Sequence, residues 1–142
     1  MPITLTVPEG LLSAEAQAQA QAFAGLSEAL LRVAQLGGNA FMTPNVVGTI
    51  NVLPKGYVFA GGKPAAAAFV ELKLPGIALA TPEAKQAFIE AATTVVERAA
   101  EGRLRRDHIW TNIVYAADGS WGIAGRAYSD ADLVAAIQSA AA

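Results

Sequence analysis

The chain has 142 residues, of which 54% are hydrophobic and only 15% are charged, so it has enough apolar material for one globular unit of ordinary size. It has no cysteine, which excludes disulfide bonds, thiolate catalysis and cysteine-based metal sites. Ten basic and twelve acidic residues give a net charge of −2, and no run of Lys and Arg provides the basic surface that a nucleic-acid-binding protein needs.

The chain has no stretch as apolar and as long as a membrane span, and its start lacks the basic flank and apolar core of a signal peptide. We therefore expect a soluble, cytoplasmic protein that binds neither membranes nor nucleic acid. The one locally basic segment, residues 103–106, follows a predicted helix, where cations complement the negative end of the helix dipole. A high alanine content and few charges favour burial between subunits.

The first predicted elements are a strand and a long helix. Apolar residues alternate with threonines over residues 3–7, as in a half-buried strand, and residues 8–10 end it. Ser13 is the predicted N-cap of a helix that runs until Gly37 and Gly38. The apolar stripe of this helix comprises Phe23, Leu26, Leu30 and Val33.

A second strand over residues 47–53 and a third over residues 69–74 are separated by glycine-containing turns. Thr81 then provides an N-cap and Pro82 the first helical position of a second helix. Its predicted buried stripe is Phe88, Ala92, Val95, Val96 and Ala99.

A fourth strand is predicted over residues 108–115, followed by a hairpin-like turn at 118–125. Ser129 and Asp132 have the spacing of a capping box, so they predict a short terminal helix at about 129–141. We expect this helix to pack against a neighbouring subunit or the sheet edge.

The order of elements repeats along the chain. Pro75 follows Pro8 by 67 residues, and Gly119 follows Gly56 by 63. A strand–helix–strand crossover makes each pair of strands parallel and places both helices on one face. We therefore predict a single α+β domain of two β-α-β repeats, at about 2–62 and 67–125, with a four-stranded mixed sheet, two helices on one face and a short C-terminal helix.

Several motifs in this order resemble the tautomerase superfamily. The opening Met1-Pro2-Ile3 and the glycine-rich turn at 119–125 are similar to 4-oxalocrotonate tautomerases. Residues 51–64 resemble a stretch of the macrophage migration inhibitory factors, and residues 108–112 resemble both that group and the cis-3-chloroacrylic acid dehalogenases. The resemblance implies a homotrimer of two-repeat subunits that uses no cofactor and no metal.

The resemblance also implies that Pro2 is catalytic, as a free amine after removal of Met1. An N-terminal amine has a pKa of about 7.7–8.0, and an apolar pocket would favour its neutral form further. Such an amine can act as a general base on a small keto or enol acid near neutral pH.

The arginines with which such enzymes hold carboxylates are missing in this chain. Leu12, Leu79 and Trp110 occupy the corresponding positions, and Thr43 lies where the cytokine-like proteins have a lysine. We therefore expect neither dehalogenation nor dicarboxylate isomerisation.

The resemblance suggests an apolar, amide-lined pocket. In it Pro2 is the base and Asn112 hydrogen-bonds a substrate oxygen, while Trp110 and Trp121 form the walls. The cations placed where they could hold a carboxylate are Lys73, Lys63 and Arg126.

Other interpretations stay open at this point. A retained Met1 would turn the Pro2 nitrogen into an amide without basicity. The same scaffold would also suit a non-catalytic trimer that binds a ligand or a protein partner, and a duplicated β-α-β order is also found in ferredoxin-like dimers. His108 is expected to have a structural role.

Overall fold

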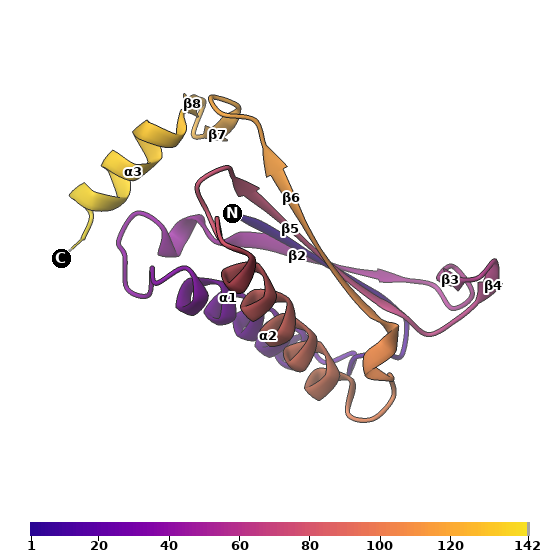
Figure 1. Cartoon of the computed structure of the whole chain (residues 1–142). Helices are drawn as coiled ribbons and strands as arrows, with labels where there is room; N and C mark the ends of the chain where they lie inside the picture. The colour runs from indigo at the N-terminus through magenta and orange to yellow at the C-terminus, as the bar shows by residue number, and fades with distance from the viewer. Residues whose placement is uncertain (142) are drawn as a thin grey trace.

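The computed structural model describes residues 1–141, which form a four-stranded sheet covered on one face by two helices (Figure 1). The strand order is β2-β1-β5-β6. The strands are β1 (Pro2–Pro8), β2 (Val47–Leu53), β5 (Ala68–Pro75) and β6 (Ile109–Ala116), and the covering helices are α1 (Ala16–Val33) and α2 (Pro82–Ala100).

Strand pairing confirms the two predicted crossovers. β1 pairs in parallel with β2, and β5 pairs in parallel with β6, while β1 and β5 are antiparallel at the centre. The sheet is therefore mixed, and both β-α-β units place their helix on the same face, as the handedness of such crossovers requires.

The core lies between the sheet and the two helices. Alternate residues of β1 and β5 are fully buried, and each fully buried aliphatic side chain contributes roughly 1.5–3 kcal/mol. The residues of this core that are completely inaccessible include Ile3, Leu5, Val70, Leu72, Leu26, Leu30, Phe88 and Val96. The other side chains of the central strands point to the opposite side of the sheet, which we call the open face because none of the helices described over residues 1–141 covers it.

Gly48 allows the edge strand β2 to pair closely with β1. A Cβ atom at this position would lie 1.8 Å from the carbonyl oxygen of Ile3 and 2.7 Å from the ring of Phe23. Both distances are shorter than any real carbon contact, so a side chain would push the first helix or the strand aside. Glycine at position 48 is thus a requirement of the β1–β2 pairing.

The predicted start of α1 was wrong by about two residues. The helix begins at Ala16 with Glu15 as its N-cap, and no side chain caps it. Ser13 Oγ accepts a hydrogen bond from the backbone N–H of Glu15, at 3.3 Å. This bond is a local turn contact that precedes the helix, so it does not cap α1. At the other end α1 stops at Val33, before the predicted glycines, because Gln35 takes a left-handed conformation with φ of 56°.

Two further details differ from the sequence prediction. In α2, Thr93 and Ala100 are buried, whereas Val95 and Ala99 are only partly buried. The Thr93 hydroxyl donates to the carbonyl of Ile89 at 2.7 Å, and this hydrogen bond offsets the free-energy cost of removing the hydroxyl from water. His108 lies in the short 3₁₀ turn Arg106–His108 rather than in a strand.

The predicted caps of the other two helices are confirmed. The Thr81 hydroxyl accepts a hydrogen bond from the N–H of Ala84 at 3.1 Å. Ser129 and Asp132 form a reciprocal capping box at the start of α3 (Asp130–Ser139). This helix lies away from the sheet edge and contacts the segment after α1 (Figure 1). The side-chain amide of Asn39 in that segment donates to the carbonyl of Ile137 at 3.0 Å.

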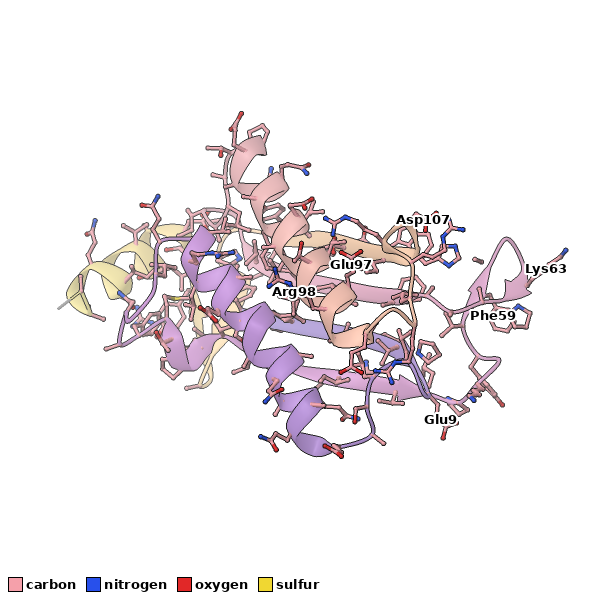
Figure 2. All side chains as sticks on the ribbon, turned by 90° about the horizontal axis from the view of Figure 1, so that it is seen from below. Glu9, Phe59, Lys63, Glu97, Arg98 and Asp107 are labelled. Carbon is pink, nitrogen blue, oxygen red and sulfur yellow. The ribbon has the colours of Figure 1, made fainter. Side chains whose placement is uncertain are left out.

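Two small hairpins lie beyond the ends of the sheet. β3 (Phe59–Ala60) pairs with β4 (Lys63–Pro64), and Figure 2 shows Phe59 and Lys63 on this projecting hairpin. At the other end, β7 (Trp121–Ile123) pairs with β8 (Arg126–Tyr128), which confirms the predicted hairpin. None of the helices in residues 1–141 is long and apolar enough to cross a membrane.

The caps lead to a stability prediction. Thr81→Ala removes the only side-chain acceptor at the start of α2, so the free energy of unfolding should fall by about 1 kcal/mol. Ser13→Ala should change it by less than about 0.5 kcal/mol, because Ser13 does not cap α1. Urea unfolding followed by circular dichroism measures both, and an equal loss in the two variants would contradict the assignment.

Candidate active site at the N-terminus

The register of β1 and β2 determines where the N-terminus lies. Pro2 is paired with Val47, and the N–H of Val47 donates to the carbonyl of Met1 at 3.3 Å. A 3₁₀ turn, Thr43–Asn45, precedes β2 and brings the carbonyl of Asn45 to the Met1 amine, which donates a hydrogen bond to it. The first two residues are therefore ordered parts of the sheet.

A cavity of about 410 Å³ opens beside these residues, and we call it the N-terminal cavity. Its volume is within the range of small-molecule sites. β1 contributes Pro2, β5 contributes Lys73, and the β7 hairpin contributes Trp121. Most of the surface is apolar, and its polar side chains are those of Asn45, Lys73, Tyr115 and Ser120.

The Met1 amine reports the electrostatic character of this site. Burial lowers the pKa of this amine from its ordinary value of 8.0 to about 6. Desolvation disfavours the charged form, so the amine is mainly neutral at pH 7. The Pro2 nitrogen, one residue further along β1, is an amide in this chain and has no basicity.

A second, smaller cavity of about 190 Å³ lies behind the first, and we call it the apolar cavity. Its lining includes Leu36 and Met42 from the segment after α1, Leu79 from the loop before α2, and Leu133 and Ile137 from α3. Met1 and Trp121 line both cavities. These two residues form the wall between them.

Three of the predicted site residues come together at the N-terminal cavity: Pro2, Lys73 and Trp121. The Lys73 ammonium is 3.2 Å from a carboxylate oxygen of Glu71, and both side chains are about half exposed. An exposed pair of this kind contributes little energy, so the lysine can exchange this partner for another anion.

Trp110 and Asn112 lie outside the lining of this cavity, on the open face of β6. Trp110 stacks on Phe69 with ring centroids 5.7 Å apart and stays 42% exposed. Asn112 is paired with Glu71 in the sheet and precedes Val114, which lines the cavity, by about 7 Å along the strand.

The other two candidate cations lie away from the cavity lining. Arg126 lies 3.2 Å from Asp132 and 4.6 Å above the ring of Tyr128. Lys63 is on the β3–β4 hairpin that projects beyond the sheet (Figure 2). His108 accepts or donates a hydrogen bond with the carbonyl of Ala66 at 2.9 Å, in agreement with the structural role expected for it.

Sequence reasoning missed two groups at this site. Asn45 provides the carbonyl that binds the Met1 amine, and the parallel register of β1 and β2 was the signal that would have placed it there. Tyr115 lines the cavity at the end of β6, and its hydroxyl lies 3.0 and 3.1 Å from the carbonyls of Ala78 and Leu79. Burial raises the pKa of Tyr115, so this phenol stays protonated at neutral pH. Nothing in the local sequence pattern indicated this contact.

Within residues 1–141, no group of three or more His, Asp and Glu side chains converges in a way that would bind a metal ion. The lining of the N-terminal cavity supplies an amine, a lysine, a phenol, a hydroxyl and a side-chain amide in mostly apolar surroundings.

No protein-family model matches the sequence, and no curated protein matches it significantly. Solved structures do match. A wild-type fused 4-OT in a symmetric trimer is 18% identical, with 94% of this chain and 98% of that chain covered and a TM-score of 0.75. Pt0534 inactivated by 2-oxo-3-pentynoate is 17% identical, with 92% and 98% covered and a TM-score of 0.76.

The macrophage migration inhibitory factor of Toxoplasma gondii is 15% identical, with 90% of this chain and 100% of that chain covered and a TM-score of 0.68. At this level of identity the likeness establishes the fold. The chain therefore has the α+β fold of the tautomerase superfamily, as its motifs predicted.

The buried amine generates a pH prediction for the chain that retains Met1. Between pH 6 and 8 a larger fraction of the Met1 amine is protonated in the unfolded chain than in the folded chain, because the amine has the higher pKa when the chain is unfolded. The free energy of unfolding should therefore rise with pH across this window and fall as the pH drops towards 6. Solvent reaches part of the amine, so we expect a change of about 1 kcal/mol rather than the full value of a two-unit shift.

Urea unfolding at several pH values between 5.5 and 8.5 measures this change. The same chain with an acetylated N-terminus is the control, because acetylation removes the titrating group and leaves all others. Identical pH dependence in the two forms would show that the amine is not desolvated.

Proposed function

We propose that this protein is a cofactor-free keto–enol tautomerase in which removal of Met1 frees the Pro2 amine to act as general base. The observation that carries the proposal is the position of Pro2, which begins β1 at the wall of the N-terminal cavity. Initiator methionine is removed efficiently when a small residue such as proline follows. The Pro2 amine would then lie in the surroundings that already disfavour charge on Met1.

The reaction needs one proton to change places. The neutral amine takes the hydroxyl proton of an enol acid while the C2–O bond becomes a carbonyl, and the electron pair of the C2–C3 double bond accepts the proton that the protonated amine returns to C3. Atoms and charge balance without a cofactor. A base with a pKa near the working pH serves both steps.

The remaining cavity residues suit a small 2-keto or enol acid. Lys73 is the cation that we propose to bind the substrate carboxylate, because it lines the cavity and its present partner Glu71 is exposed. Trp121 provides an apolar wall. We keep Asn112 and Trp110, on the open face, as proposed further contacts of the substrate. Arg126 already contacts Asp132 and Tyr128, so of the proposed residues it is the one least available to bind a substrate.

We also propose a homotrimer. Large apolar side chains stay exposed on the open face and on the projecting hairpin, among them Tyr57, Phe59, Trp110 and Val114. Exposed apolar groups of this size gather where another chain packs. Several chains with this fold were solved as trimers of fused 4-OT, which supports the same assembly.

Activity depends on the Pro2 amine in this proposal. Purified protein whose intact mass shows loss of Met1 should convert phenylenolpyruvate to phenylpyruvate, measured by the decay of enol absorbance. Pro2→Ala keeps a removable methionine but replaces the secondary amine and its fixed ring, so kcat/KM should fall by at least about 100-fold. Equal rates for the two proteins would exclude Pro2 from the mechanism.

A matched control separates the amine from the rest of the cavity. Insertion of glutamine between Met1 and Pro2 prevents removal of methionine and keeps Pro2 as an amide, so this protein should fold and show no turnover. Incubation with 2-oxo-3-pentynoate, the inactivator of the neighbour Pt0534, should add its full mass at Pro2 of the processed protein only.

The second candidate function is a non-catalytic trimer that binds a ligand through the same scaffold. The burial of Met1, which is only 3% exposed, favours it if the methionine is retained in the cell. Intact mass of the protein from its native source decides between the two, because a retained methionine leaves no basic amine at Pro2.

The trimer proposal has its own test. Phe59→Asp places a carboxylate on an apolar side chain of the hairpin that is 55% exposed in one chain, so sedimentation velocity should show three chain masses for wild type and mainly monomer for the variant. Gln17→Asp, on the exposed surface of α1, is the control and should leave the trimer intact. A monomeric wild-type protein would contradict the proposal.

A further inference from the structure

We infer that removal of Met1 joins the N-terminal cavity to the apolar cavity, and that the substrate is a 2-keto or enol acid with a long, unbranched apolar chain on C3. This inference rests on the proposed tautomerase function and names its substrate class. It places the reacting carbons beside Pro2 and the chain behind Trp121, in the apolar cavity.

The first step of the argument is the wall between the cavities. Only Met1 and Trp121 belong to both linings among the described residues. Met1 is 3% exposed and belongs to the same buried cluster as Met42 and Leu79, which also line the apolar cavity. Loss of this residue in processing therefore removes one of the two residues of the wall and leaves Trp121 as the other.

The second step is the chemistry of the chamber behind the wall. The side chains that line the apolar cavity, among them Leu36, Leu79, Leu133 and Ile137, carry no charge and no side-chain hydrogen-bonding group apart from the indole N–H of Trp121. A polar or charged substituent would be desolvated there without a partner, which is costly. An apolar chain gains the free energy of leaving water.

The third step concerns the shape of the occupant. The space that processing vacates held a methionine side chain, which is unbranched and four heavy atoms long. A linear alkyl or thioether chain reproduces this shape, whereas a phenyl ring at C3 is wider than the side chain that it would replace. The chamber therefore favours linear over aromatic substituents.

The fourth step is the rigidity of the chamber. Leu133 is 1% exposed, and its helix α3 is held by the Ser129–Asp132 capping box at one end. At the other end the Asn39 side-chain amide donates to the carbonyl of Ile137, and its side-chain oxygen Oδ1 accepts from the N–H of Met42 at 2.9 Å. α3 and the segment after α1 thus form a fixed rear wall, so the chamber exists before a ligand binds.

The test uses a series of unbranched substrates: 2-oxobutanoate, 2-oxohexanoate and 2-oxooctanoate, with phenylpyruvate as the aromatic competitor. Exchange of the C3 protons in deuterium oxide, followed by proton NMR, reports tautomerisation of each. For the processed protein we expect kcat/KM to rise by up to about fourfold for each added methylene, the factor that corresponds to burial of one CH₂. The value for 2-oxooctanoate should also exceed that for phenylpyruvate.

Two variants change the apolar cavity and leave the N-terminal cavity intact. Ala34→Leu fills part of the apolar cavity and should lower kcat/KM for 2-oxooctanoate by at least tenfold, with less than a twofold change for 2-oxobutanoate. Ile137→Ala enlarges it and should shift the preference to a longer chain, 2-oxodecanoate. Ala91→Leu, in α2 and outside both cavities, adds the same volume as Ala34→Leu and should leave the profile unchanged.

The outcomes separate this inference from the proposed function. If the processed protein exchanges none of the substrates, the tautomerase proposal fails. If it exchanges all of them with no rise along the series, or if Ala34→Leu lowers every rate equally while its melting temperature is unchanged, the proposed function stands and the chain-binding chamber is overturned. Should Ala34→Leu not fold, the shift expected for Ile137→Ala decides the question alone.

Discussion

The parallel pairing of β1 with β2 is the constraint on which the site depends. It is possible only because Gly48 leaves room for the Ile3 carbonyl and the Phe23 ring, where any Cβ would overlap both. Once this register is set, Pro2 lies beside Val47, and the 3₁₀ turn before β2 lies against the chain terminus. A terminus that is usually the least ordered part of a domain is thereby fixed in the sheet. The geometry of the site is thus a consequence of backbone packing about a glycine.

Fixing the terminus in the sheet also sets its electrostatics. An amine held against the core loses water, and its charged form loses more stabilisation than its neutral form, so the pKa of the Met1 amine falls to about 6. Burial is the cause of this shift, and the cavity residue Lys73 is paired with the carboxylate of Glu71. Because this ion pair is exposed, Lys73 can exchange Glu71 for another anion. In the function that we propose, the base and the anion site are therefore parts of one arrangement.

Much of the fold could be predicted from the sequence because its elements are set by local signals. Alternation over residues 3–7 and the Thr81-Pro82 cap specify a strand and a helix start without reference to distant residues. The start of α1 could not be predicted in this way, since its alanine- and glutamine-rich first turn has no apolar stripe to locate it.

At the site, the motifs that resemble known tautomerases led to Pro2 and Trp121, but the contact of Asn45 with the N-terminus depends on the pairing of segments more than forty residues apart. The apolar cavity was inaccessible to sequence reasoning for the same reason, because five separate segments line it.

Met1 connects the stability of the fold with its chemistry. As a buried side chain it contributes to the core, and its loss would cost a few kcal/mol if the space stayed empty. As the N-terminal residue it acylates the Pro2 nitrogen, the group that we propose as the base. In the function that we propose, removal of Met1 lowers the stability of the core and frees a reactive amine beside an opened chamber, and a ligand that refills the space with apolar atoms recovers part of the lost burial. On this proposal, binding of the substrate chain restores packing in the core, which couples affinity for an apolar chain to the stability of the processed protein.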